Sequence, residues 1–209
     1  MSLKSILKPS DYEDFLVHIY FESRPNLAGC IRVSYLDLCR TLREVSKSGK
    51  NIRNQEAIPY LEQVFSELKN QGTQDQEQFD TWHKDVCNRL VEIYKENSYT
   101  KFHIGQAQKW VNMTFKYIFT LGEQRVPGFS EVYEFCHAPL DSKIVEKLEK
   151  EYGFPPLKCG RWSHLDYGEY FCIQQRIRRR FRLAPLDVEF LLWSGKDIDK
   201  AYIILGGEE

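Results

Sequence analysis

The amino-acid sequence predicts an all-α protein, folded as one compact multi-helix domain. Apolar residues recur every three or four positions through most of the chain, which is the spacing of one helix face. No segment shows the sustained apolar–polar alternation that is typical of a half-buried strand. The 209 residues are 42% hydrophobic and 14% aromatic, enough to fill a sizeable core.

Each helix is expected from its periodicity and its boundary residues. The first follows the acidic turn Asp11–Asp14 and ends before the break at Pro25. Ser34 and Asp37 have the spacing of a capping box, which predicts a helix that starts there and reaches Val45. Further helices are expected at 55–70, 79–95, 103–122, 141–152, 166–182 and 185–193.

The candidate domain boundary is the polar segment Gln71–Gln76, which would separate residues 1–70 from 77–209. Because this segment is short, we expect a single domain over residues 1–209. The apolar segment Ala201–Leu205 near the carboxyl terminus is expected to be a strand or a docked tail. No long repeat occurs, which argues against a helical solenoid.

Composition excludes several classes of function. The formal net charge is −1, so binding to nucleic acid would require a local basic patch. Six cysteines without a CxxC pair indicate thiols in a reducing compartment. No signal peptide or membrane-spanning run is evident, so a cytoplasmic protein without membrane contact is expected. No glycine-rich phosphate loop or common metal-ligand spacing appears, and we predict no cofactor and no metal site.

The segment 103–122 is the most apolar of the expected helices. Between its two apolar stripes lies a narrow polar line formed by Gly105, Lys109, Asn112 and Lys116. One interpretation is that this line faces solvent. The other is that it faces a cleft, where partial burial would make the Lys109 amine a usable nucleophile.

Asp141 follows Cys136-His137-Ala138-Pro139-Leu140 and precedes an expected helix. The same four residues, Ala-Pro-Leu-Asp, recur at 184–187 before another expected helix. This repetition favours a helix-capping role for Asp141. A capping aspartate at the mouth of a cleft could also act as an acid or a base.

The stretch Ile104–Met113, continuing to Tyr117, and the pattern His137-x-Pro139-x-Asp141 resemble a family of uncharacterised bacterial all-helical proteins. They are also distantly similar to the helix-hairpin-helix DNA glycosylases, above all the archaeal 8-oxoguanine type. In that superfamily a lysine on a central helix attacks the sugar C1′, and an aspartate that caps a later helix assists.

The resemblance implies that Lys109 and Asp141 are catalytic and that Gly105, Asn112 and His137 line the pocket. The sequence departs from the superfamily in three respects, one of which is that Lys109 lies two positions further from Gly105 than in the commoner glycosylases. Gly105 stands alone where the hairpin usually has two glycines, and the cysteine spacing of an iron–sulfur cluster is absent. The resemblance therefore implies a shared fold but does not determine the activity, because one fold can carry different functions.

The expected helix 166–182 contains five arginines within seven residues: Arg176, Arg178, Arg179, Arg180 and Arg182. Such a strip suits contacts with phosphates, for which the planar guanidinium is well adapted. The alternative is a solvated face that pairs in part with the acidic region Glu146–Glu151.

The sequence therefore favours a nucleic-acid-binding protein, with DNA or RNA as its partner and a glycosylase-like base-excision activity at Lys109 and Asp141. The alternative is a non-catalytic helical protein–protein interaction module or a homo-oligomer, in which the aromatic residues form an interface. Whether the protein is an enzyme stays open at this level.

Overall fold

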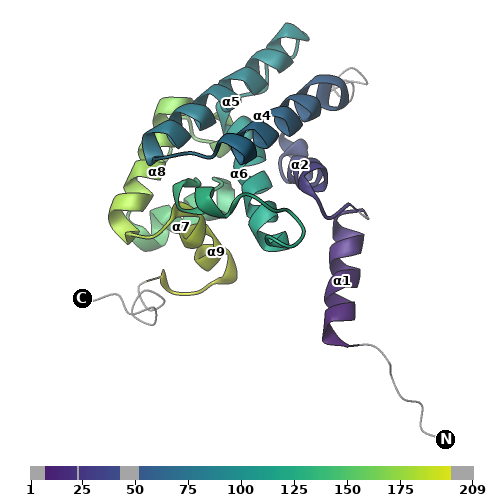
Figure 1. The fold of residues 1–209 in the computed structure, drawn as a ribbon. Helices are drawn as coiled ribbons and strands as arrows, with labels where there is room; N and C mark the ends of the chain where they lie inside the picture. The colour runs from purple at the N-terminus through teal and green to yellow at the C-terminus, as the bar shows by residue number, and fades with distance from the viewer. Residues whose placement is uncertain (1–7, 23, 43–51, 199–209) are drawn as a thin grey trace, which may run out of the picture.

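A computed structural model describes residues 8–22, 24–42 and 52–198, and within these ranges the chain is helical without any strand (Figure 1). The all-α prediction is confirmed. The α-helices are α1 (Pro9–Tyr20), α2 (Leu27–Leu36), α4 (Ile58–Gln71), α5 (Gln76–Glu96), α6 (Ile104–Leu121), α7 (Ser142–Tyr152), α8 (Tyr167–Phe181) and α9 (Pro185–Ser194). Single helical turns of 3-10 or π type cover Cys39–Thr41, Arg53–Ala57, Ser130–Phe135 and Trp162–His164.

The helices from α5 onward lie within a few residues of their predicted positions, because their boundaries are encoded locally. Asp75, Asp141 and Asp166 each precede a helix and accept a hydrogen bond from a backbone N–H of its first turn. These bonds satisfy donors that the helix itself leaves unpaired. Gly153 and Gly195 end α7 and α9 in the left-handed conformation that favours glycine.

The prediction of a helix that begins at Ser34 is wrong. The chain instead forms α2, which starts after Asn26 and contains Ser34 in its interior. The Asn26 side chain accepts from the Gly29 N–H at 2.9 Å, and the Ser34 hydroxyl donates to the Cys30 carbonyl at 2.6 Å. A serine that bonds back to the preceding turn does not cap a helix. Residues 43–51 and the predicted tail segment 201–205 lie outside the described residues.

Helix α6 is the centre of the fold. It makes its most extensive contacts with α2 and α5, and side chains on nearly all sides of it are buried. Trp110 is fully buried on this helix and donates its indole N–H to the Ile31 carbonyl of α2 at 2.8 Å. A helix that is apolar on two sides needs neighbours on both, which explains its central place.

Two apolar clusters lie on opposite sides of a polar layer. The first gathers side chains of α2, α4, α5 and α6, and the second gathers side chains of α7, α8 and α9. Helices α4 and α5, which flank the segment 71–76, both belong to the first cluster. The polar layer joins α6 to the helices of the second cluster, and it contains Lys109, Asn112, His137 and Asp141, which were singled out from the sequence.

None of the described helices is long and apolar enough to cross a membrane.

Candidate functional site

The polar line of α6 points into the protein. Lys109 is 4% exposed, and Gly105 and Asn112 are buried as well. Lys116 is half-buried. The interpretation that this line faces solvent is therefore wrong, because Asp141 before α7, Tyr170 of α8 and Glu189 of α9 lie against it. The residues of the polar line lie in different surroundings.

Lys109 and Asp141, 32 residues apart in the chain, form a buried ion pair, called here the charged pair. The Lys109 ammonium donates to Asp141 Oδ2 at 2.5 Å, and the two side chains are 5% and 14% exposed. Asp141 Oδ1 accepts from the Ile144 N–H at 3.0 Å and so caps α7. The Trp162 ring lies 6.0 Å from the ammonium. One carboxylate thus serves both the helix cap and the lysine.

Gly105 brings the turn that carries Trp162 against the amino end of α6. A Cβ at this position would lie 2.0 Å from the Trp162 carbonyl oxygen and 2.8 Å from Ser163 Cα, distances that no side chain tolerates. The Gly105 N–H donates to the Leu165 carbonyl at 3.2 Å. Glycine is required here for close backbone approach.

A second lysine–carboxylate pair lies further along α6. The Lys116 ammonium is 2.7 Å from Glu189 Oε2 and 2.8 Å from Oε1, and the Glu189 side chain is fully buried. Burial raises the pKa of Glu189, and the nearby Lys116 charge acts in the opposite direction. The lysine also lies over the rings of Phe190 and Trp193.

Asp37 of the chain after α2 extends this group of charges. Burial raises its pKa, while the hydrogen bond donated by the Tyr117 hydroxyl at 2.8 Å and the charges of Lys109 and Lys116 lower it. Two lysines and three carboxylates are therefore close enough to influence one another, although only the two pairs are in direct contact.

Two hollows lie near the charged pair, although neither Lys109 nor Asp141 lines them. One, of about 470 Å³, is lined by residues of α7 and by the turn around Trp162, and it includes Ser142, the residue after Asp141. The other, also about 470 Å³, lies at the amino end of α6. Its cationic and imidazole side chains are Arg40, Lys101, His103, Arg161 and His164. No carboxylate occurs among the described residues that line this second hollow, called here the basic hollow.

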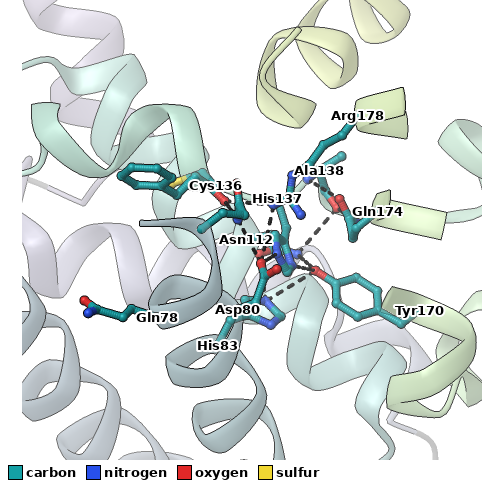
Figure 2. Close-up of polar contacts among 12 residues, drawn as sticks. Gln78, Asp80, His83, Asn112, Cys136, His137, Ala138, Tyr170, Gln174 and Arg178 are labelled. Carbon is teal, nitrogen blue, oxygen red and sulfur yellow. Dashed lines mark hydrogen bonds and ion pairs between the residues drawn. The ribbon is translucent and has the colours of Figure 1, made fainter. Parts of the chain in front are cut away.

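Deeper in the polar layer lies a set of side chains that carries few formal charges, shown in Figure 2 and called here the neutral network. Its members are His83 of α5, Asn112 of α6, His137 of the segment before α7, and Tyr170 of α8. All of them are fully buried. The network ends at the carboxylate of Asp80, which is the partner of His137 nearest the surface.

The hydrogen bonds of the neutral network determine the tautomer of each histidine. Asp80 Oδ1 only accepts, so His137 Nε2 donates to it at 2.7 Å and His137 Nδ1 accepts from the Tyr170 hydroxyl at 2.7 Å. Asn112 Nδ2 donates to Tyr170 at 2.8 Å, and His83 Nε2 donates to Asn112 Oδ1 at 3.0 Å. In this arrangement every donor meets an acceptor with both imidazoles neutral.

Burial keeps both histidines neutral. It lowers the pKa of His137 to about 4, although the hydrogen bond to Asp80 acts in the opposite direction. Burial also lowers the pKa of His83, and the neighbouring His137 adds to the effect; the two rings are 4.4 Å apart. For Asp80, burial raises the pKa, but the bond from His137 and the charge of Arg178 outweigh it and leave the pKa lowered.

Gln108 connects the network to the charged pair. Its amide accepts from the Leu140 N–H at 3.1 Å and donates to the Leu140 carbonyl at 2.8 Å. It also accepts from Asn112 at 3.1 Å. Because Leu140 directly precedes Asp141, these bonds hold the carboxylate opposite Lys109. His137 and Asn112 therefore lie one step away from the charged pair and do not contact it directly.

The five arginines at 176–182, of which Arg182 follows the end of α8, do not share one face. Arg178 points inward, where it donates to the Phe135 carbonyl at 3.1 Å and lies 3.5 Å from Asp80. Arg176 lies over the Phe154 ring and Arg180 over those of Tyr152 and Phe181. Apart from Arg178, the arginines at 176, 179, 180 and 182 are exposed.

Several members of the site were not singled out from the sequence. Glu189 is buried on an apolar helix. The sequence pattern that could have identified it is an acidic residue within the apolar run Val188–Trp193. His83, Gln108 and Tyr170 gave no comparable signal, because each occupies an ordinary position on an amphipathic helix. Their roles depend on partners 29 or more residues away.

Among the described residues, no group of three histidine, cysteine or acidic side chains is arranged to hold a metal ion, and each of the six cysteines is a free thiol. Comparisons with protein-family models, with curated proteins and with solved structures found no match to this chain.

Proposed function

We propose that the protein acts on nucleic acid through an amine-dependent, DNA-glycosylase-like site, with Lys109 as the nucleophile and Asp141 as the assisting carboxylate. The observation that carries the proposal is the charged pair: a nearly buried lysine on the central helix, held at 2.5 Å by the carboxylate that caps α7. This is the pairing that the resemblance to the glycosylases implies.

The reaction needs the lysine as a free amine. Asp141 is placed to accept a proton from the Lys109 ammonium, since Oδ2 is already its hydrogen-bond acceptor. The amine nitrogen then bonds to C1′ of the sugar while the bond from C1′ to the base breaks. The electron pair of that bond leaves with the base, which takes up a proton.

The surroundings of the pair suit such a substrate. The hollow of about 470 Å³ beside Ser142 and Trp162 has the size of a small-molecule site, which a base flipped out of the stack could enter. The basic hollow beside it offers cationic side chains for the phosphates of the same strand. The exposed Arg179 and Arg182 of α8 are further candidates for phosphate contacts.

The decisive experiment is borohydride trapping on a duplex that carries an abasic site. The Lys109 amine condenses with the C1′ aldehyde of the opened sugar, water leaves, and hydride reduces the resulting imine to a stable amine. We expect a covalent protein–DNA adduct with the unmodified protein. Lys109→Arg should abolish it, because the guanidinium keeps the ion pair with Asp141 but is not nucleophilic.

Lys116→Arg is the matched control, because it changes the other half-buried lysine of the same helix and also preserves its ion pair. We expect this variant to form the adduct at the rate of the unmodified protein. No adduct from the folded unmodified protein, or an adduct that survives Lys109→Arg, would overturn the proposal.

A further inference from the structure

Helix α1 carries an apolar stripe that the rest of the described chain does not cover. Tyr12, Phe15, Leu16 and Ile19, called here the α1 stripe, are 54%, 59%, 65% and 59% exposed. The helix contains no buried residue and extends away from the other helices (Figure 1). Contiguous exposed apolar residues on one helix face mark an interaction surface.

The contacts of α1 with the rest of the chain lie at its carboxyl-terminal end and on the side opposite the stripe. Tyr20, the last residue of α1, contacts Tyr117, with 2.8 Å between the two hydroxyl oxygens. Asp14 pairs with Arg125, and the part-buried Val17 packs against the first apolar cluster. At 3.6 residues per turn, Asp14 and Val17 are about 150° around the helix from the centre of the stripe. These contacts orient the helix so that the stripe faces outward.

The spacing of the stripe identifies its partner. Positions 12, 15, 16 and 19 read the same in both directions, so two copies of α1 in antiparallel orientation would match residue for residue. Tyr12 would lie opposite Ile19 of the second copy, and Phe15 opposite Leu16. Such self-complementarity is what a two-fold symmetric interface requires.

The polar residues beside the stripe agree with this pairing. Asp11 and His18 lie on the same side of the stripe, near its two ends. In the antiparallel arrangement, Asp11 of each copy lies beside His18 of the second copy. The offset between them along the helix axis is about 3 Å. A histidine and a carboxylate are then neighbours at both ends of the interface, where Asp11 Oδ2 also accepts from the Lys8 N–H of its own chain at 2.6 Å.

We propose that the α1 stripe is a self-association surface and that its partner is a second copy of this chain, bound antiparallel across a two-fold axis. Each stripe residue exposes roughly 100 Å² of side chain, so the two copies together bury about 800 Å². This area is at the low end of specific interfaces, and the dimer is therefore weak and concentration-dependent. The inference is independent of the proposed function.

The test is a measurement of molecular mass by sedimentation equilibrium at total concentrations from about 5 to 500 μM. We expect the mass of the unmodified protein to rise from monomer towards dimer. Leu16→Glu and Leu16→Lys should each remain monomeric, because like charges then meet near the two-fold axis. Leu36→Glu is the matched control, since Leu36 is 55% exposed but lies outside α1; it should dimerise like the unmodified protein.

An equimolar mixture of Leu16→Glu and Leu16→Lys distinguishes self-association through the α1 stripe from binding to any other partner. The two variants bring opposite charges together across the two-fold axis, so the mixture should regain the dimer that each lacks alone. A mass that stays monomeric in the unmodified protein, an equal loss in Leu36→Glu, or no dimer in the mixture would each overturn the proposal.

Discussion

The charged pair and the neutral network both lie against α6, but they satisfy their buried polar groups in different ways. In the charged pair, two formal charges neutralise each other at the edge of the polar layer, next to a hollow. In the neutral network, burial removes the charge of two histidines, and hydrogen bonds match every donor with an acceptor. The first arrangement places a proton donor and an acceptor in direct contact, which the proposed reaction requires, whereas the second holds the helices in one geometry.

The neutral network is also connected to the charged pair by hydrogen bonds. Gln108 takes hydrogen bonds from Asn112 of the network and from Leu140, the residue before Asp141. The interior network thereby positions the Asp141 carboxylate. A buried amide between them is well suited to this role, because it has both donors and acceptors and no charge to desolvate.

The largest effect is expected when the network is interrupted. Asn112→Leu removes hydrogen bonds to His83, Gln108 and Tyr170. Tyr170 keeps its bond to His137 and Gln108 keeps its bond from Leu140, but the buried His83 Nε2 loses its acceptor Asn112 Oδ1. We expect the free energy of unfolding to fall by about 4 kcal/mol, from roughly 1 kcal/mol for each lost bond and the further cost of the unsatisfied His83 donor. Urea denaturation measures this loss, and Gln63→Leu on the exposed face of α4 is the control. A loss below about 1 kcal/mol would show that the network is not stabilising.

A somewhat smaller effect is expected from acid. His137 has a pKa of about 4 in the folded protein, and an unfolded histidine has a pKa of about 6.5. Because the unfolded chain binds this proton more readily, stability falls as pH drops from about 6.5 to 4, by roughly 3 kcal/mol. His83 should add to the loss, because burial also lowers its pKa.

The measurement is the free energy of unfolding from pH 7 to 4.5 for the unmodified protein and for His137→Gln. The glutamine amide can still donate to Asp80 but does not titrate. The difference between the two curves isolates His137 from the carboxyl groups, which are the same in both proteins. Two parallel curves would contradict the neutral assignment of this histidine.

The smallest effect is expected from the charged pair, because the Asp141 carboxylate is 14% exposed and water can solvate it when its cation is removed. Lys109→Met should destabilise the protein by about 2 kcal/mol, because it leaves the Asp141 carboxylate without its cation. Asp141→Ser keeps the helix cap and removes the charge. In a double-mutant cycle we expect the combined variant to lose about 1–2 kcal/mol less than the sum of the single variants. Additive losses would mean that the two side chains do not interact in solution.

Much of the helical framework was predictable from sequence. The starts of α7 and α8 are capped by aspartates that form bonds within four residues, and the apolar period marks their buried faces. Such local interactions are readable without a structure. The failure at Ser34 shows the limit, because the same serine can cap a helix or bond back inside one. Only the packing of α2 on α6 distinguishes the two.

Sequence by itself determined the helical class, most of the helix boundaries, and the choice of Lys109 and Asp141 as residues of interest. The tertiary structure decided that these two side chains meet, that Arg178 points inward, and that His83, Tyr170 and Glu189 join the polar layer. The physical reason is the range of the interactions. A helix cap depends on neighbours one turn away, whereas burial and ion pairing depend on side chains that only the packing of distant helices brings together.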